Sequence, residues 1–382
     1  MEQQAIEVPR GLAGVVVTDT AIGDVRGREG FYHYRQFSAV ELAEHRTFED
    51  VWHLMFHGEL PDAPALEEFT KRTARLRRLS PPVREALPVI ARATAASGPL
   101  TGLHTALPLA GAAAGFRPVY DLTPGERLED ALSACALVPT LLTALHRLGE
   151  GLEPVEPRDD LPYAANYLYM LTGEEPSPRE ARAVERYLIS TVEHGFNAST
   201  FTGRVIASTG ADIAACLTGA AGALSGPLHG GSPSRALDAL DAIGTPDRID
   251  DWVRERVRTG KRIMGFGHPV YRTEDPRSRM LKRIAQDFGG PLTDFAVQVE
   301  ERVEAILDEL KPGRELHTNV EFYAAVVMEL CGLPRTMFTP TFCAARVVGW
   351  SANILEQADD SKIIRPSARY TGPVPPVPVP PL

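Results

Sequence analysis

The stretch Ser225-Gly226-Pro227-Leu228-His229-Gly230-Gly231 places one histidine among residues that have almost no side chain. An alanine-rich pattern of helical type, which begins at Gly210, leads into this stretch. Because glycine lacks a Cβ atom, the backbone or a ligand can approach the imidazole closely. These neighbours are unusual for a histidine that only packs in a core, and they indicate a functional site at the edge of a helix.

Two further stretches share this character. The first is Glu193-His194-Gly195-Phe196-Asn197-Ala198-Ser199-Thr200. The second is Gly265-Phe266-Gly267-His268-Pro269-Val270-Tyr271-Arg272, which continues to Asp275-Pro276-Arg277. Each contains a histidine next to glycine at the edge of a helical pattern, and together they mark the region where a site is expected.

Composition limits the class of protein. A chain of 382 residues with 44% hydrophobic and 24% charged residues is typical of a globular protein with about two domains. The net charge of −10 argues against DNA or RNA as the main partner, because neutralising phosphates requires a basic surface. A phosphorylated small ligand needs only a local group of cations. Lys261, Arg262 and Arg272 form such a group, although solvated surface charges give the same pattern.

Cysteine spacing and the N-terminal sequence indicate the cellular compartment in which the protein is expected. No cysteine pair has metal-ligand or redox spacing, so we expect buried free thiols in a reducing compartment at Cys135, Cys216, Cys331 and Cys343. The N-terminus lacks the basic-then-apolar pattern of a signal peptide, and no apolar run approaches the length of a membrane span. We therefore expect a cytoplasmic protein with no metal and no nucleic-acid or membrane partner.

Apolar periodicity predicts an almost entirely α-helical chain after a short N-terminal β-hairpin. Residues 13–19 are rich in β-branched residues and predict one strand. Residues 23–30 are rich in turn formers, and residues 31–35 alternate as a second strand. The period becomes helical from residue 39. Further helices are expected over 64–78, 82–97, 103–114, 126–148, 160–172, 178–194, 209–224, 232–243, 247–259, 277–288, 292–310, 319–331 and 341–357.

The C-terminal segment has a different character. After Gly372 it reads Pro-Val-Pro-Pro-Val-Pro-Val-Pro-Pro-Leu. Such a run cannot build a core, so we expect a disordered, solvent-exposed tail of polyproline II type over residues 373–382.

Several charged residues are candidates to complete the site. Arginines bind carboxylates through two parallel hydrogen bonds, so several converging arginines would make a pocket for a di- or tricarboxylate. The candidates are Arg272, Arg277, Arg346 and Arg365, although each alone also fits a surface position. Glu321 lies in Asn319-Val320-Glu321-Phe322-Tyr323, between apolar and aromatic neighbours at a helix start. Burial there would raise its pKa and suit it to proton abstraction, whereas its alternative role is to satisfy backbone amides.

The ordered motifs resemble the citrate synthase family. They are the stretches around His194, His229 and His268, then Asp275-Pro276-Arg277, Asn319-Val320-Glu321-Phe322-Tyr323, Arg346 and Ile364-Arg365-Pro366. The opening Gly11-Leu12-Ala13-Gly14-Val15-Val16 with its hairpin is also similar to that family. The resemblance runs from about Gly11 to Gly372, and the ordered set is far more specific than any one motif.

The resemblance implies an all-α, two-domain, citrate synthase-like fold and a homodimer. By motif, residues 1–229 and 323–372 would form the large helical domain, and residues 230–322 the small domain that closes over the substrates. The site would be complete only when the domains close, which would keep water away from the activated thioester.

The implied reaction makes the protein a transferase of the tricarboxylic acid cycle. It would condense acetyl-CoA with oxaloacetate and hydrolyse citryl-CoA to citrate and CoA. Removing a proton beside a thioester needs a base and a donor that stabilises the enol oxygen. By resemblance, Glu321 is the base, His229 donates to the thioester oxygen, and His268 donates to the oxaloacetate carbonyl.

The resemblance also implies the substrate contacts. Oxaloacetate would be held by one histidine and three arginines, the last of which reaches in from the partner subunit: His194, Arg277, Arg346 and Arg365. CoA would be contacted by two glycines and a cation: Gly265, Gly267 and Arg272. The acyl-CoA is a co-substrate, and neither a permanently bound cofactor nor a metal is implied.

Three positions depart from the family pattern. Glu321 stands where the usual base is aspartate, and a shift of about an ångström in a reacting group can cost ~100-fold in rate. Thr191 replaces a histidine that many members carry, and Tyr34-Arg35-Gln36 replaces Tyr-Arg-Gly. Neither of these two changes touches the proposed proton transfers.

Alternatives to a citrate synthase therefore stay open. One is a 2-methylcitrate synthase that uses propionyl-CoA, since a single methyl group is worth only about 1–3 kcal/mol of discrimination. Another is a ligand-binding homologue with weakened catalysis, suggested by Glu321. A helical scaffold without a small-molecule site would leave the glycine-flanked histidines unexplained.

Overall fold

The computed structural model describes residues 6–230, 233–268, 270–360 and 362–380. Within them the chain forms sixteen α-helices and one three-stranded sheet, which confirms the all-α class with a short N-terminal hairpin. Gly231 and Pro269 of the quoted stretches, and the last two residues of the tail, lie outside the described residues.

The sheet is antiparallel and has the order β1-β2-β3, with β1 at Gly23–Arg26, β2 at Phe31–Tyr34 and β3 at Phe37–Ser38. The strand predicted at 13–19 is wrong, because no strand forms there and Val16 is 83% exposed. β-branched residues favour a strand only where a partner edge and a buried face exist. Here Tyr32 and Tyr34 supply the buried face, and the turn-rich segment before them supplies the partner strand.

The helices follow in chain order. Their bounds are α1 Ala39–His45, α2 Phe48–His57, α3 Ala63–Arg75, α4 Pro81–Ala93, α5 Pro99–Ala114, α6 Pro124–Gly149, α7 Tyr163–Thr172, α8 Pro178–Thr191, α9 Ala198–Ala207, α10 Ile213–Leu224, α11 Pro233–Ile243, α12 Ile249–Arg258, α13 Pro276–Phe288, α14 Pro291–Leu310, α15 Val320–Leu330 and α16 Phe338–Ala358. Short 3-10 helices are η1 Arg10–Leu12, η2 Val119–Asp121, η3 Pro246–Arg248 and η4 Arg335–Met337.

Helix ends have local causes. Thr47, Thr123 and Ser177 open α2, α6 and α8 with capping boxes, in which the hydroxyl accepts a backbone N–H and a carboxylate three residues later accepts the cap's own N–H. Every helix predicted after residue 64 is present, with ends shifted by at most four residues. The sequence prediction missed α9, whose short, Ser/Thr-rich sequence lacks a clear apolar period.

The core is centred on α6 and α16, which pack against each other and against several other helices. By length and composition α6 could cross a membrane, which corrects the expectation that no apolar run is long enough. In the structure, however, 78% of its apolar window is buried inside the protein, as in a core helix.

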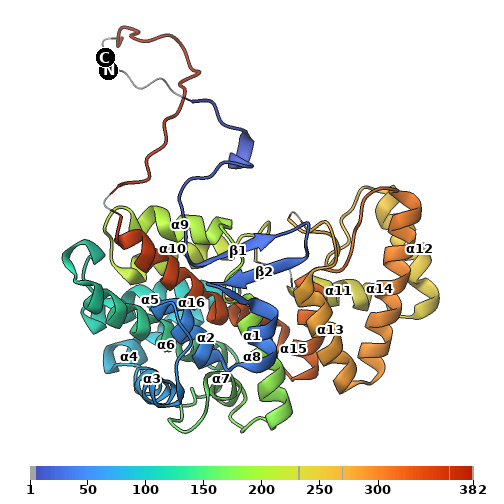
Figure 1. Cartoon of the computed structure of the whole chain (residues 1–382), viewed down its shortest axis with the longest axis horizontal. Helices are drawn as coiled ribbons and strands as arrows, with labels where there is room; N and C mark the ends of the chain where they lie inside the picture. Colours follow the sequence, from blue (N-terminus) through green and yellow to red (C-terminus); the bar gives the residue numbers. More distant parts are fainter. Residues whose placement is uncertain (1–5, 231–232, 269, 361, 381–382) are drawn as a thin grey trace.

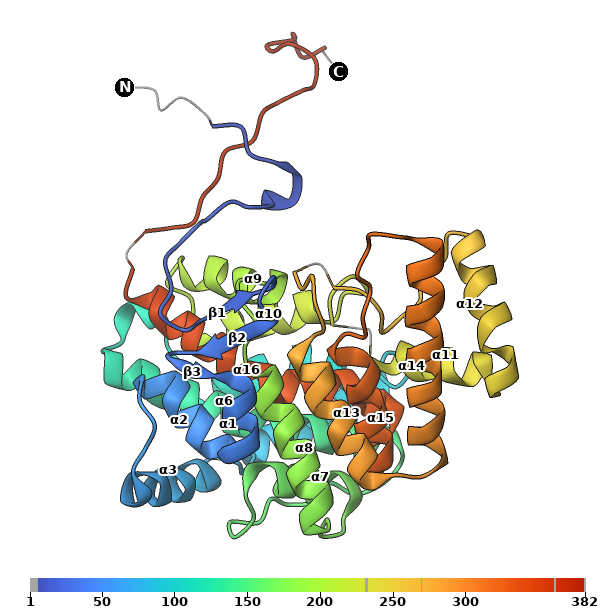
Figure 2. The ribbon, with the colours of Figure 1, turned by 45° about the vertical axis from the view of Figure 1, so that its right-hand side comes forward.

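Figure 1 shows how the elements are arranged. Helices α11 to α14 lie at one end of the molecule, and α15 packs against α11 and α13 on one side and α8 on the other. In this view the β1–β2 hairpin lies between the end formed by α11 to α14 and the remaining helices. The N-terminal segment and the C-terminal tail leave the body side by side (Figure 2), and Arg369 pairs with Glu7 between them. The domain division at residues 230 and 322 stays a prediction.

The cysteines are buried free thiols, as their spacing predicted. Burial raises the pKa of each thiol to about 12. Among the described residues, no three His, Cys, Asp or Glu side chains are placed to share a metal ion.

Candidate active site

One face of α16 fixes the segment that carries His194. Arg346 is buried, and its Nε donates to the Thr191 carbonyl at 2.8 Å. One helical turn later, Trp350 Nε1 donates to Ser199 Oγ at 3.1 Å. Side chains four residues apart lie on the same helix face, so these two bonds hold both ends of the segment against α16.

The centre of the segment lies directly on the α16 backbone. A Cβ atom added at Gly349 would lie 2.0 Å from the Val192 carbonyl oxygen, so only glycine permits this approach. Asn353 Nδ2 donates to Oε2 of Glu193 at 2.9 Å, and Oε1 accepts the backbone N–H of His194 at 2.9 Å. The buried carboxylate therefore connects α16 to the histidine.

His229 is partly buried after α10. Its Nε2 lies 2.8 Å from Ser199 Oγ. The same oxygen accepts from Trp350 Nε1, and its hydroxyl donates to Asn197 Oδ1 at 2.7 Å. Burial, followed by the positive charge of Arg346, lowers the pKa of His229 to about 4. The imidazole is therefore neutral at pH 7.

The loop that carries His268 pairs with the start of α15. Asn319 N donates to the Gly265 carbonyl at 2.9 Å, and Asn319 Nδ2 donates to the Gly267 carbonyl at 3.0 Å. The two glycines have φ values of +86° and +81°, which favour a residue without a side chain. This pairing brings the loop next to the helix turn that carries Glu321.

The tautomer of His268 follows from its contacts. Nδ1 accepts the backbone N–H groups of Val270 at 3.0 Å and Tyr271 at 3.1 Å. Burial, followed by the charge of Arg277, lowers the pKa of His268 to about 4, so the ring is neutral at pH 7. A neutral imidazole that accepts at Nδ1 carries its proton on Nε2. His268 is therefore a hydrogen-bond donor through Nε2.

Asp275 orients Arg277 in the buried first turn of α13. Its carboxylate accepts from Nε of Arg277 at 3.0 Å and from Nη2 at 2.7 Å, and it also accepts the Val320 N–H at 3.1 Å. Although burial disfavours the charge, the Asp275 carboxylate raises the pKa of Arg277. Nη2 lies 3.4 Å from His268 Nε2, so the guanidinium and the imidazole border the same space.

His194 faces this group from the other side. Its Nε2 lies 2.9 Å from Tyr271 Oη, and its ring centroid is 5.5 Å from that of His268. Burial, followed by the charge of Arg277, lowers the pKa of His194 well below its ordinary value. The structure thus brings His194, His268 and Arg277 together.

Glu321 lies partly buried in the first turn of α15, where its N–H donates to Asn319 Oδ1 at 3.0 Å. Burial raises the pKa of the Tyr187 phenol in α8, the charge of Arg346 lowers it, and the charge of Glu321 raises it. The carboxylate and Arg346 therefore act on the same buried phenol.

The remaining predicted site residues lie outside this group. Arg365 is exposed on the extended segment after α16, where the N–H of Ile364 donates to Ser208 Oγ at 3.1 Å. The side chain of Arg272 is also exposed. Within a single chain, neither arginine joins the buried charges.

Sequence reasoning missed the residues that support the histidines. Ser199 and Tyr271 lie in the quoted stretches, but neither carries a signal of its role. Trp350 and Asn353 follow Arg346 at helical spacing and so lie on the same helix face. Because Arg346 was already expected in the site, this spacing was the signal that could have identified them.

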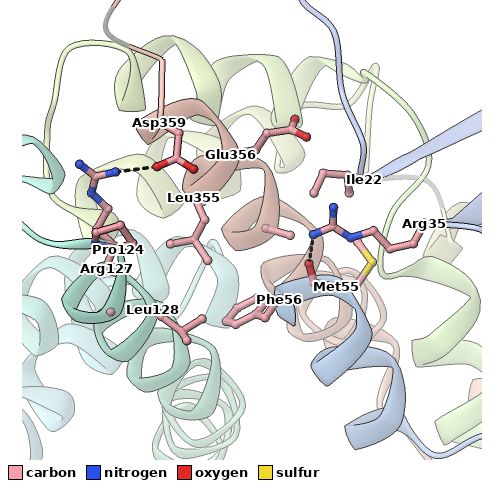
Figure 3. A pocket seen from close by; sticks show the side chains of 12 residues that line it. Ile22, Arg35, Met55, Phe56, Pro124, Arg127, Leu128, Leu355, Glu356 and Asp359 are labelled. Atoms are coloured by element: carbon pink, nitrogen blue, oxygen red, sulfur yellow. Dashed lines mark hydrogen bonds and ion pairs between the residues drawn. The ribbon is translucent and has the colours of Figure 1, made fainter. Parts of the chain in front are cut away.

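A separate cavity of about 430 Å³ lies where residues from the N-terminal sheet region, α2, α6 and α16 meet (Figure 3). Its charged lining is largely occupied, since Arg127 pairs with Asp359 at 3.0 Å and Arg35 Nη2 donates to the Met55 carbonyl at 2.6 Å. None of the predicted site residues lines it.

Comparison with known proteins agrees with the fold and these motifs. A family model described as "Citrate synthase, C-terminal domain" matches residues 11–367. Citrate synthase 2 of Bacillus subtilis (strain 168) is 36% identical over 364 residues, covering 95% of this chain and 96% of that protein. The citrate synthase of Deinococcus radiodurans is 35% identical over 367 residues, covering 96% of each.

Two solved structures match the fold over 98% of this chain. Citrate synthase from Thermotoga maritima MSB8 matches with a TM-score of 0.85 and 34% identity, covering 98% of both chains. A ternary complex of carboxymethyl coenzyme A and oxaloacetate with the citrate synthase of Thermoplasma acidophilum matches with a TM-score of 0.89 and 26% identity, covering 98% of both chains.

A helical fold in which buried histidines lie beside buried arginines is typical of a site that binds carboxylates. The chain belongs to the citrate synthase family, and it is an enzyme of the citrate synthase type.

Proposed function

We propose that this enzyme condenses acetyl-CoA with oxaloacetate and hydrolyses the resulting citryl-CoA to citrate and CoA. The observation that carries the proposal is the pairing of Asn319 with Gly265 and Gly267, because it joins the loop of the donor His268 to the turn of the base Glu321. No bound cofactor or metal takes part in the proposed steps.

The first step forms an enol. The Glu321 carboxylate takes a proton from the methyl group beside the thioester, and His229 donates to the thioester oxygen as charge develops there. This donation needs the tautomer with its proton on Nδ1, in which the Ser199 hydroxyl turns from Asn197 Oδ1 and donates to Nε2 of His229 instead. A neutral imidazole supplies the donor without a buried positive charge, which agrees with its lowered pKa.

The second step forms the carbon–carbon bond. The enol carbon attacks the ketone carbon of oxaloacetate while Nε2–H of His268 donates to the ketone oxygen. Arg277, Arg346 and His194 hold the substrate carboxylates. Water then attacks the thioester carbon, the C–S bond breaks, and CoA leaves as a thiol.

CoA would lie along the glycine loop. Phe322 and Leu316 fill the space beside Gly265 and Gly267, so the backbone of this loop would face the pantetheine chain. The exposed guanidinium of Arg272 would meet a phosphate group. Closure of residues 230–322 over the remaining chain, and a cytoplasmic location, belong to the same proposal.

A homodimer completes the proposal. The segment that carries Arg365 leaves the body of its own subunit (Figure 2), so we assign this arginine to the partner's oxaloacetate site. Large apolar side chains on the two extended terminal segments are exposed, including Val16 at 83%, Ile363 at 62% and Tyr370 at 69%, and a second chain would cover them.

A CoA-release assay with two acyl donors tests the function. We expect release that depends on oxaloacetate and a higher kcat/KM for acetyl-CoA than for propionyl-CoA. The reverse preference would assign a 2-methylcitrate synthase. Folded protein that binds oxaloacetate but releases no CoA would be the ligand-binding homologue.

A further inference from the structure

The β1–β2 hairpin contacts the half of the site that contains His194. A Cβ atom added at Gly195 would lie 3.3 Å from Val25 Cγ2, so the strand packs directly over the residue after the histidine. The Tyr32 ring centroid lies 5.4 Å from that of His194, and its hydroxyl donates to the Ser190 carbonyl at 3.0 Å. The hairpin is therefore anchored beside His194.

The tip of the same hairpin contacts residues 270–274, which follow the His268 loop. The N–H of Arg272 donates to the Gly27 carbonyl at 3.0 Å. A Cβ atom added at Gly27 would lie 2.2 Å from the Val270 carbonyl oxygen. Real Cβ atoms essentially never come closer than 3.0 Å to such a group, so any side chain at this position would push the two segments apart.

A second glycine makes the same approach. A Cβ atom added at Gly30 would lie 2.9 Å from Thr273 Oγ1, and φ at Gly30 is +62°. Gly27 lies outside this left-handed region. A substitution at Gly27 therefore tests the contact itself, whereas one at Gly30 would also strain the turn.

Tyr271 lies between these contacts and joins the two imidazoles. Its side chain is only 3% exposed, and Oη lies 2.9 Å from Nε2 of His194. Its backbone N–H donates to Nδ1 of His268 at 3.1 Å, one of the two bonds that set the tautomer of that ring. A movement of residues 270–274 would disturb both histidines.

We propose that the β1–β2 hairpin is a strap that holds residues 270–274 against His194, and that Gly27 and Tyr271 are positioning residues for the condensation. The hairpin is bound to the His194 segment at its base and to the Arg272 backbone at its tip. This inference rests on the proposed function, since it assigns the strap an effect on oxaloacetate turnover.

Kinetics of Gly27→Ala test the strap, with Gly149→Ala as the matched control. An added Cβ at Gly149, the exposed last residue of α6, meets nothing within 4 Å. A shift of about 1 Å in a reacting group costs up to ~100-fold, so we expect Gly27→Ala to raise KM for oxaloacetate about tenfold and Gly149→Ala to leave it unchanged. A smaller folded fraction would lower kcat only, so the KM change separates positioning from loss of protein.

Tyr271→Phe provides a second variant that removes a single oxygen atom. We expect a higher KM for oxaloacetate, because His194 loses its hydroxyl partner, and little change in melting temperature. Wild-type KM values in both Gly27→Ala and Tyr271→Phe would overturn the inference.

Hydrogen exchange of the full-length chain tests the strap without turnover. The Arg272 amide should exchange faster in Gly27→Ala than in Gly149→Ala, and equal rates would overturn the strap. A wild-type protein that releases no CoA would instead overturn the proposed function. The two failures are therefore distinguishable.

Discussion

At position 321 the carboxylate lies one methylene further from the backbone than in an aspartate. The backbone there is fixed, because the N–H of Glu321 donates to Asn319 Oδ1 and the N–H of Val320 donates to Asp275 Oδ2. The extra length must therefore be taken up by the side chain rather than by a shift of α15. This keeps the proposed base beside the His268 loop.

Replacing Glu321 by glutamine removes the base and keeps its shape. General base catalysis contributes about 10²–10⁴-fold to a rate. We therefore expect the rate of CoA release to fall at least about 100-fold, while the affinity for oxaloacetate changes little. Stopped assays and calorimetric titration measure the two quantities. Glu329→Gln, at the far end of α15, is the control, and an undiminished rate in Glu321→Gln would show that the base lies elsewhere.

The neutral imidazoles make the stability of the protein depend on pH. Burial lowers the pKa of His194, His229 and His268, so the unfolded chain binds protons at these rings from about pH 6.5, whereas His229 and His268 in the folded chain bind them only near pH 4. Glu193 acts in the opposite direction, because burial raises its pKa to about 7 and the folded chain holds that proton more tightly. Burial also lowers the pKa of His57 and His146, and it raises the pKa of Glu49, Asp130 and Glu304. Five rings against four carboxyls leave the unfolded chain with more bound protons below pH 6.5.

The free energy of unfolding is therefore expected to fall as the pH falls from about 6.5 to about 4. Urea unfolding at pH 7 and pH 5 measures the change. In His268→Gln the fall should be smaller, because one of the titrating rings is removed. A wild-type stability that stays level or rises on acidification would contradict this assignment of neutral rings.

Among the elements, α16 determines how the site is assembled. One face of α16 contacts the segment from Thr191 to Ser199 through four residues: Arg346, Gly349, Trp350 and Asn353. A single helix therefore fixes the arginine proposed to bind oxaloacetate, the turn of His194 and, through Ser199, His229.

Gly349→Ala tests this contact. The added Cβ would lie 2.0 Å from the Val192 carbonyl oxygen and 3.0 Å from Oε2 of Glu193, so α16 and the segment must separate. We expect about 1–3 kcal/mol of destabilisation, as for other overpacked sites, together with a higher KM for oxaloacetate. Melting curves and kinetics measure both. Gly149→Ala should be neutral or stabilising by up to about 1 kcal/mol, and an unchanged melting temperature in Gly349→Ala would exclude the tight approach.

Sequence patterns predicted those helices and strands whose formation depends mainly on residues close in sequence. Long helices with an apolar face were predicted to within a few residues. The strand at 13–19 and helix α9 were not, because each depends on tertiary partners. In α9, Arg204 is buried and bonds to Asn353 and Gln357 of α16, an interaction that no local period reveals. The histidines were found because glycine neighbours mark close approach, whereas Ser199 and Tyr271 gain their roles only through distant contacts.

For the whole molecule, the proposed dimer predicts a complementation result. If Arg365 serves the partner's site, Glu321→Gln and Arg365→Ala chains that are each inactive should form mixed dimers with one intact site. Random exchange of subunits would then restore about a quarter of wild-type activity. Denaturing and refolding the two variants together, with each refolded alone as the control, measures this. No recovery despite mixed dimers would place Arg365 in the site of its own chain.

The buried thiols have a practical consequence for all of these assays. Disulfide reagents react with thiolates, and thiols with a pKa of about 12 that are closed off from solvent offer almost none at neutral pH. A chromogenic disulfide present throughout the reaction should therefore report the liberated coenzyme continuously, with a negligible protein blank and without inactivating the catalyst. Denaturant should then release four additional equivalents of colour per chain, which gives an internal count of intact polypeptide.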